Sequence, residues 1–185
     1  MRAFKAFNKN MTCTLGKGSY QYQEGRTYRE DEAQAHSTGF HCASYILDCY
    51  RYYAKSKDTV ICPVEALGDI DEDGSDTKIS CTVMKIGKRL TAEQIVFEAM
   101  RYMKSHPKYS DLANVHKDKG SDSFFCIVRG KDPAASGTKG TVLGLIRENS
   151  RHNITGLAIY KVGCDGIQPG RYYNLEGEEV EDAQS

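Results

Sequence analysis

The segment KISCTVMKIG, residues 78–87, alternates apolar and polar side chains in the manner of a β-strand. In such a strand Ile79, Cys81 and Val83 share one face. The preceding run TVICPVEAL, residues 59–67, is also typical of extended chain, and the acidic segment between the two runs predicts a solvated hairpin turn. Working outward from these two runs, the sequence predicts a sheet of mainly antiparallel strands.

Two other segments carry apolar residues at helical spacing. The first begins after Ser44, a good N-cap residue, and predicts a helix at about 44–55. The second begins with the capping box TAEQ and predicts a helix at 91–105, which ends shortly before Pro107. We therefore expect an α+β fold, with a mainly antiparallel β-sheet and two principal helices.

The chain has 185 residues, which favours a single domain over 1–185. The segment DPAASGTKG is the best linker candidate, because it combines Pro, Gly and small residues. It suggests a sub-division into a β-rich core with helices, 1–130, and a C-terminal β-hairpin region, 138–181.

The charge and the cysteine content narrow the function classes. The 25 basic and 25 acidic residues cancel, so the global field that strong direct nucleic-acid binding needs is absent. No apolar stretch approaches the ~20 residues of a membrane span, and no leader segment is visible, so we expect a cytoplasmic protein. The seven cysteines are odd in number and form no C-x-x-C pair, which favours reduced core thiols.

Two segments carry metal-ligand atom types, but their spacing is poor. Asp69, Asp71 and Asp73 hold positions 1, 3 and 5 of a calcium loop, but position 12 is Ser80 where a bidentate Glu is required. A solvated acidic turn is the simpler interpretation. The run around His41 supplies imidazole and thiol groups for zinc, but neighbouring side chains of an extended chain point in different directions. No metal ligand set is assigned on this basis.

The tyrosines of the segment 44–55 have two interpretations. In the first, the tyrosines belong to the core and to the rim of a buried helix. In the second, Tyr45 and Tyr52, together with Arg51, form part of a recognition surface. Tyrosine suits the second role because it offers a large, rigid contact area with a polar end.

Four stretches carry a resemblance to an uncharacterised domain of phage and prophage proteins. These stretches are FKAFNKNMTC, GFHCASYILDCYRYY, GDIDEDGSDTKISCTVMKIG and CDGIQPGRYYNLEGEEVE. In that family one residue usually separates the histidine from the cysteine, whereas here Cys42 follows His41 directly. The resemblance implies an origin in a mobile element, a β-rich core and residence in a bacterial host cell. It implies no particular activity.

A second, fainter resemblance is to ADP-ribosyltransferases. In that superfamily a Gly-x-[Tyr/His]-x-[Ala/Ser] strand leads into a helix that carries tyrosines, as GFHCA does here before Tyr50 and Tyr53. The resemblance implies NAD as cofactor. It implies that His41 orients a ribose hydroxyl and that Tyr50 or Tyr53 stacks on the nicotinamide. Lys5 matches the early basic position, and Glu176 or Glu178 matches the acidic one, with Glu178 as the residue that stabilises the developing positive charge.

Three functions are expected, in order of preference. The first is binding without catalysis or cofactor, directed at a host protein or a protein–nucleic acid complex, as in an anti-CRISPR-like inhibitor of a host nuclease. The second is mono-ADP-ribosyl transfer with NAD, and the third is a structural or accessory role in a phage. In the first reading the His41 imidazole is a structural hydrogen-bonding group at the corner between strand and helix.

Overall fold

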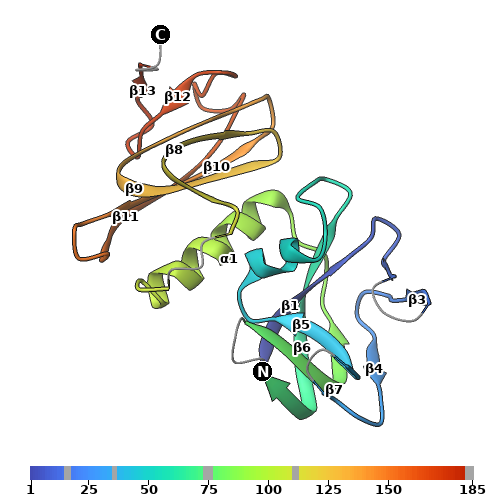
Figure 1. Cartoon of the computed structure of the whole chain (residues 1–185). Coiled ribbons are helices and arrows are strands. Elements are labelled where there is room, and N and C mark those ends of the chain that lie inside the picture. Colours follow the sequence, from blue (N-terminus) through green and yellow to red (C-terminus); the bar gives the residue numbers. More distant parts are fainter. Residues whose placement is uncertain (15–17, 35–36, 73–76, 110–112, 182–185) are drawn as a thin grey trace. The chain divides into compact units, whose positions relative to one another are not determined.

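The computed structural model describes residues 1–14, 18–34, 37–72, 77–109 and 113–181. The chain divides into two compact units, Met1–Thr91 and Ala92–Ser185 (Figure 1). Each unit has its own hydrophobic core and is described by itself. The expectation of a single domain over 1–185 stays a prediction, because compactness does not test whether the units fold separately.

The first unit is built on one sheet that closes on itself. Its strands follow the order β4-β7-β5-β1-β6, and β6 also pairs with β7, so that four of them form a small barrel. A separate two-stranded sheet pairs β2 with β3. The bounds are β1 Arg2–Phe7, β2 Thr12–Cys13, β3 Tyr20–Gln21, β4 Thr27–Arg29, β5 Phe40–Ala43, the 3₁₀ helix η1 Ile46–Arg51, β6 Val60–Glu72 and β7 Lys78–Ile86.

The strand β7 contains the segment from which the sheet was predicted. It pairs antiparallel with β4, β5 and β6, and it is buried over most of its length. Ile79 and Cys81 lie in the core as expected, while Val83 is half-buried and Ser80 is fully buried. The alternation is weak because side chains on both faces of this strand are buried.

The closed sheet has a gap between β1 and β5. These strands share a single residue pair, Phe4 with Ala43, whereas β1 pairs with β6 from Arg2 to Phe7. Beyond that pair the Lys5 side chain bridges the gap, since its Nζ donates a hydrogen bond of 2.7 Å to the backbone oxygen of His41. A lysine side chain thus takes the place of the backbone pairing.

The second unit combines one α-helix with a six-stranded sheet. The sheet order is β11-β10-β9-β12-β13, and β8 pairs with β9. The helix packs over β10, where Gly144 makes room: a Cβ there would lie 2.7 Å from Val96 Cγ1. The bounds are α1 Ala92–Ser105, β8 Val115–Asp122, β9 Phe125–Gly137, β10 Val142–Glu148, β11 Ile154–Lys161, β12 Tyr172–Tyr173 and β13 Glu179–Val180.

The strands β8, β9 and β10 wind as a coil of parallel turns. Val115 pairs with Ile127, and Val142 pairs with Phe125, both in parallel register. Such short connections between parallel neighbours require bends inside the strands. In β8 the bend falls at Asp118, which has a φ of 59° and sits at a register shift against β9.

The expected α+β fold with two principal helices is wrong. Strands make up 48% of the structure and helices 12%, and the described residues contain one helix of seven or more residues. The helix expected at 91–105 is present as α1. The helix expected at 44–55 is the 3₁₀ helix η1, in which five consecutive residues, Ile46 to Tyr50, are buried. An α-helix with one buried face would expose some of them.

The parallel ladders of the second unit also depart from the expected antiparallel sheet, although β10 and β11 form the antiparallel pair expected there. Among the described residues no helix is both long and apolar enough to cross a membrane.

Candidate functional site

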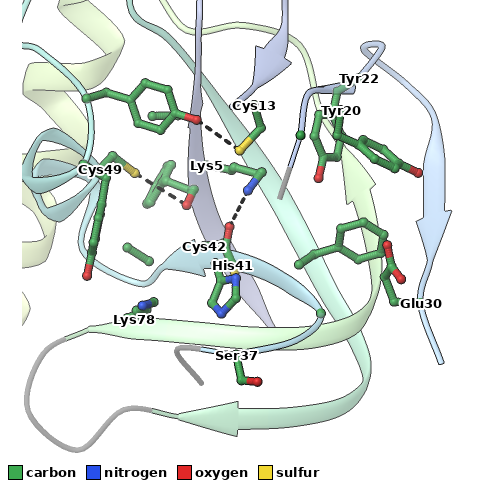
Figure 2. A pocket seen from close by; sticks show the side chains of 18 residues that line it. Lys5, Cys13, Tyr20, Tyr22, Glu30, Ser37, His41, Cys42, Cys49 and Lys78 are labelled. Atoms are coloured by element: carbon green, nitrogen blue, oxygen red, sulfur yellow. Dashed lines mark hydrogen bonds between the residues drawn. The ribbon is translucent and has the colours of Figure 1, made fainter. Parts of the chain in front are cut away.

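A cavity of about 490 Å³ lies at the gap between β1 and β5 of the first unit (Figure 2). Side chains from β1, β3, β5, η1 and the start of β7 line it. The lining combines aromatic rings, cysteine thiols and a few charged groups. This volume is within the range of pockets that bind small molecules, about 300 to 1,000 Å³.

One wall of the cavity is a cluster of aromatic rings. The ring centroids of Tyr20 and Tyr22 are 4.8 Å apart, and Phe40 lies 6.3 Å from both. Tyr22 is buried and Tyr20 is 42% exposed, so the cluster runs from the core to the surface. Burial raises the pKa of Tyr22, which keeps its hydroxyl neutral. The wall offers flat, uncharged surfaces to a ligand.

Lys5 places a buried cation beside this wall. It is 7% exposed, and its Nζ lies 5.5 Å from the centroid of the Tyr22 ring and 5.7 Å from that of Phe7. Its only hydrogen-bond acceptor within the described residues is the His41 carbonyl, and no carboxylate there pairs with it. An ammonium has three donors, and a buried charge without a counter-charge is costly. The cavity is therefore electropositive near Lys5.

Two cysteines of the cavity, Cys42 and Cys49, have a raised pKa and stay protonated thiols. The Tyr53 hydroxyl donates to Cys13 Sγ at 3.2 Å, and Cys49 Sγ donates to the Phe4 carbonyl at 3.6 Å. Burial raises the pKa of Cys49 to about 12, against the opposite effect of the Lys5 ammonium. Hydrogen bonding with Cys81, and then burial, raise the pKa of Cys42 well above its usual value. Cys42 and Cys49 therefore act as packing side chains and not as nucleophiles, because the thiolate is the nucleophilic form.

Several residues proposed from the resemblance to transferases meet at this cavity. Lys5, His41 and Tyr53 all line it, whereas Tyr50 is buried and does not. Glu178 belongs to the second unit, where it is exposed and its backbone N–H donates to Asn174 Oδ1 at 2.9 Å. The ring of His41 lines the cavity, while its carbonyl holds Lys5; a structural role for the imidazole stays a prediction.

The residues expected in a recognition surface on the tyrosines differ in exposure. Tyr45 is fully buried, while Tyr52 is 43% exposed and Arg51 is exposed. Lys78 Nζ lies 5.3 Å from the centroid of the Tyr52 ring, and both residues line the cavity. A recognition role for Tyr52 and Arg51 remains a prediction.

The acidic turn is only partly within the described residues. Asp69 and Asp71 lie in the last four residues of the strand β6, and Asp73 lies outside the described residues. Among the residues that the structure describes, the one metal-ligand cluster is His116, Asp122 and Cys126 of the second unit. Sequence reasoning missed it, although three residues of ligand type within eleven positions were a visible signal.

One protein family matches the chain. Its model, described as Domain of unknown function (DUF7666), covers residues 1–98, which include the whole first unit and its cavity. No curated protein and no solved structure matches the chain.

Proposed function

We propose that this chain, which belongs to the DUF7666 family, is a binding protein whose first unit takes up a small aromatic anion. The observation that carries the proposal is the buried ammonium of Lys5, which has no carboxylate partner among the described residues and faces a cavity with an aromatic wall. A ligand that brings a negative charge to Lys5 supplies the missing counter-ion. A planar ring on the same ligand packs against Tyr20, Tyr22 and Phe40.

The charges around the cavity support a ligand of low charge. Among the lining residues that the structure describes, Lys5 and Lys78 are the lysines and Glu30 is the carboxylate. One carboxylate near the aromatic wall disfavours a polyanion, because like charges repel. An aromatic carboxylate or a monophosphate ester of an aromatic alcohol fits this balance.

Binding of matched ligands to the full chain tests the proposal. We expect phenyl phosphate or aromatic carboxylates to bind, as measured by calorimetry and by NMR shifts at the cavity, and the corresponding neutral amides to bind at least about tenfold more weakly. A hydrogen bond to a charged group contributes about 1.5 to 3 kcal/mol, and 1.4 kcal/mol is about tenfold in affinity.

The variant Lys5→Met removes the charge and keeps an apolar stem of similar length. We expect it to lose the preference for anions, while Lys9→Met, which removes an exposed lysine of the same unit, leaves binding unchanged. Equal binding of anions and amides, or unchanged anion binding by a folded Lys5→Met variant, contradicts the proposal.

A second candidate is mono-ADP-ribosyl transfer, and the convergence of Lys5, His41 and Tyr53 on one cavity favours it. In this reaction the bond between nicotinamide and ribose breaks, and an acceptor group takes the ADP-ribose. Incubation of the full chain with labelled NAD and bacterial lysate tests it. A labelled product that disappears in Lys5→Met supports the assignment, whereas no product, or equal labelling by Lys5→Met, counts against it.

The role expected first from the sequence, inhibition of a host nuclease by surface binding, keeps Tyr52 and Arg51 as its contact residues. Tagged protein purified at low salt from expressing cells would then retain a host partner, and the double variant Tyr52→Ala, Arg51→Ala would lose it. Recovery of the tagged protein alone would oppose this role.

A further inference from the structure

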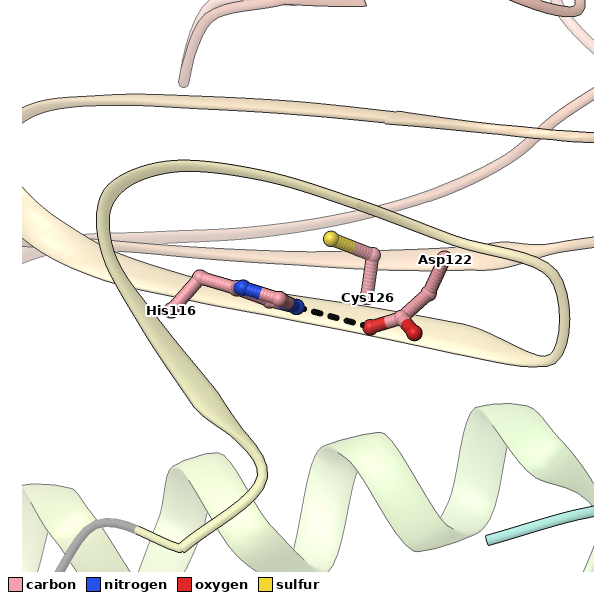
Figure 3. A group of neighbouring side chains, drawn as sticks. All are labelled: His116, Asp122 and Cys126. Atoms are coloured by element: carbon pink, nitrogen blue, oxygen red, sulfur yellow. Dashed lines mark hydrogen bonds and ion pairs between the residues drawn. The ribbon is translucent and has the colours of Figure 1, made fainter.

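We propose that His116, Asp122 and Cys126 of the second unit bind a transition metal ion, with Zn²⁺ as the ion that fits best. One ligand atom from each residue lies within 4.8 Å of the others, and Figure 3 shows the three side chains gathered at β8 and the start of β9. His116 Nε2 is 2.8 Å from Asp122 Oδ2. The proposal concerns only the second unit and is independent of the cavity in the first.

The bend of β8 brings two of these residues together. Six residues of straight strand would separate His116 and Asp122 by about 20 Å. The chain instead turns at Asp118, whose φ is 59°, so that the two ends of β8 approach each other. This explains how a contact of 2.8 Å arises between residues of one strand.

Polar groups occupy inward positions in this first turn of the coil. His116 pairs with Val128 and Gly120 pairs with Ala135 in parallel register, so the members of each pair point to the same side. Val128, Ala135 and Cys126 belong to the buried core of the unit. In the first turn, therefore, an imidazole stands where the next turn has an apolar side chain.

The backbone next to the cluster is shaped around the imidazole. A Cβ on Gly120 would lie 2.4 Å from His116 Cγ and 2.6 Å from His116 Cδ2, so only glycine leaves room for the ring in this position. A ring packed against backbone keeps its nitrogens in a fixed direction. Fixed ligands lower the cost of assembling a metal site.

The donor set selects the class of metal. Imidazole nitrogen and cysteine sulfur prefer zinc and related transition metals to Ca²⁺ or Mg²⁺. A tetrahedral Zn²⁺ with bonds of about 2.0 to 2.3 Å sets its ligand atoms roughly 3.3 to 3.7 Å apart, which small side-chain rotations within the observed 4.8 Å reach. On binding, the Cys126 thiol loses its proton to solvent and coordinates as the thiolate.

The three residues leave one coordination position for an exogenous group. The side chains of His116 and Asp122 are 39% and 27% exposed, so this position faces solvent, while Cys126 is fully buried. Three protein ligands with one open position are typical of catalytic rather than structural zinc. The site is therefore expected to bind water or a small anion on the metal.

Co²⁺ is the probe for the test, because thiolate ligation gives Co²⁺ an intense charge-transfer absorption. The full chain, reduced and stripped of metal, is titrated with Co²⁺ and then with Zn²⁺. We expect about one equivalent of Co²⁺ to produce the thiolate band and Zn²⁺ to abolish it. Zn²⁺ should also raise the melting temperature, since it binds the folded state.

Variants assign the band to this cluster, and circular dichroism checks that each is folded. Cys126→Ser should remove the thiolate band, and His116→Gln, at a half-exposed position, should weaken Co²⁺ binding by about tenfold or more. The matched controls are Cys164→Ser, an exposed thiol of the same unit, and His152→Gln, an exposed imidazole of the same unit. Both controls should leave the titration unchanged.

Two outcomes overturn the proposal. The first is the absence of a thiolate band in the unaltered chain, which reduces the cluster to a hydrogen bond between His116 and Asp122. The second is a band that persists in folded Cys126→Ser and binds with unchanged affinity in His116→Gln, which places the metal on other cysteines. If Cys126→Ser does not fold, His116→Gln alone decides between these results.

Discussion

Gly39 has a φ of +84°, a backbone conformation that favours glycine. A Cβ there would lie 2.7 Å from Ser80 Oγ and 3.0 Å from the Cys81 carbonyl oxygen. We expect Gly39→Ala to lower the free energy of unfolding by about 2 to 4 kcal/mol, from left-handed strain and overpacking together, as measured by urea unfolding. Gly25→Ala is the control, because Gly25 has a φ of +80° and nothing within 4 Å of the added Cβ. Equal losses in both variants would show that the close contacts contribute nothing.

Cys49 makes the stability depend on alkaline pH. Burial raises its pKa to about 12 in the folded protein, above its usual value of 9.0. Below pH 9 both states keep the proton; between about pH 9 and pH 12 only the unfolded state releases it, so the free energy of unfolding falls as pH rises. The contribution is up to about 1.4 kcal/mol per pH unit.

Replacement of the thiol removes this contribution. Urea unfolding at several pH values from about 8 to 11 should therefore show a shallower decline for Cys49→Ala than for the unaltered chain. Cys164→Ala, at an exposed thiol, should keep the original slope. Parallel curves for the unaltered chain and Cys49→Ala would refute the effect.

The short helix η1 depends on a buried carboxylate. Asp48 is 1% exposed; its Oδ1 accepts from Arg51 Nε at 3.0 Å and its Oδ2 from Thr77 Oγ1 at 2.5 Å. The first bond lies within η1, and the second ties η1 to the residue that precedes β7. We expect Asp48→Ala to lower the free energy of unfolding by about 1 to 3 kcal/mol, because the Arg51 guanidinium and the Thr77 hydroxyl lose a buried acceptor.

The matched comparison is Asp58→Ala in the same unit. Asp58 pairs with Lys9 at 2.9 Å, and both side chains are more than two-thirds exposed, at 72% and 79%. An exposed ion pair contributes about 0 to 1 kcal/mol, so this variant should remain close to the unaltered chain in urea unfolding. A loss for Asp48→Ala no greater than that for Asp58→Ala would mean that η1 is held by packing alone.

The elements differ in how much of them the sequence could predict. The helix α1 is predictable because its capping box, its apolar stripe and Pro107 all agree. The helix η1 is not, since apolar spacing over two turns does not separate a buried 3₁₀ segment from an amphipathic α-helix. β8 reads as a polar loop because its inward side chains are His, Gly and Asp rather than apolar residues.

The candidate sites, like the elements, could be predicted from the sequence only in part. The sequence singled out Lys5, His41 and Tyr53 by resemblance, and they line one cavity, but the gap between β1 and β5 depends on pairings between distant segments. The cluster at His116 depends on the bend at Asp118; Asp favours turns, but one Asp does not show that the two ends of β8 meet. The spacing of apolar residues along the sequence does not reveal contacts between successive parallel turns of a coil.

Across the whole molecule, each compact unit carries a core of its own. We expect residues 1–91 and 92–185, produced as separate chains, to fold independently, because each buries a contiguous set of apolar side chains. Dispersed amide NMR spectra that superimpose on parts of the full-chain spectrum would confirm this. Collapsed, poorly dispersed spectra for either piece would show that the chain is one cooperative domain.

The coil of β8, β9 and β10 also bears on how the protein tolerates changes in length. Within the described residues β8 pairs with β9 alone, so its other edge carries no strand. A further turn inserted between β8 and β9 would find parallel partners on both sides, as β9 does now with β8 and β10. The turn that carries His116, β8, would remain at the end of the coil. The second unit can thus be lengthened by whole turns of the coil, while both ends of the coil stay unchanged.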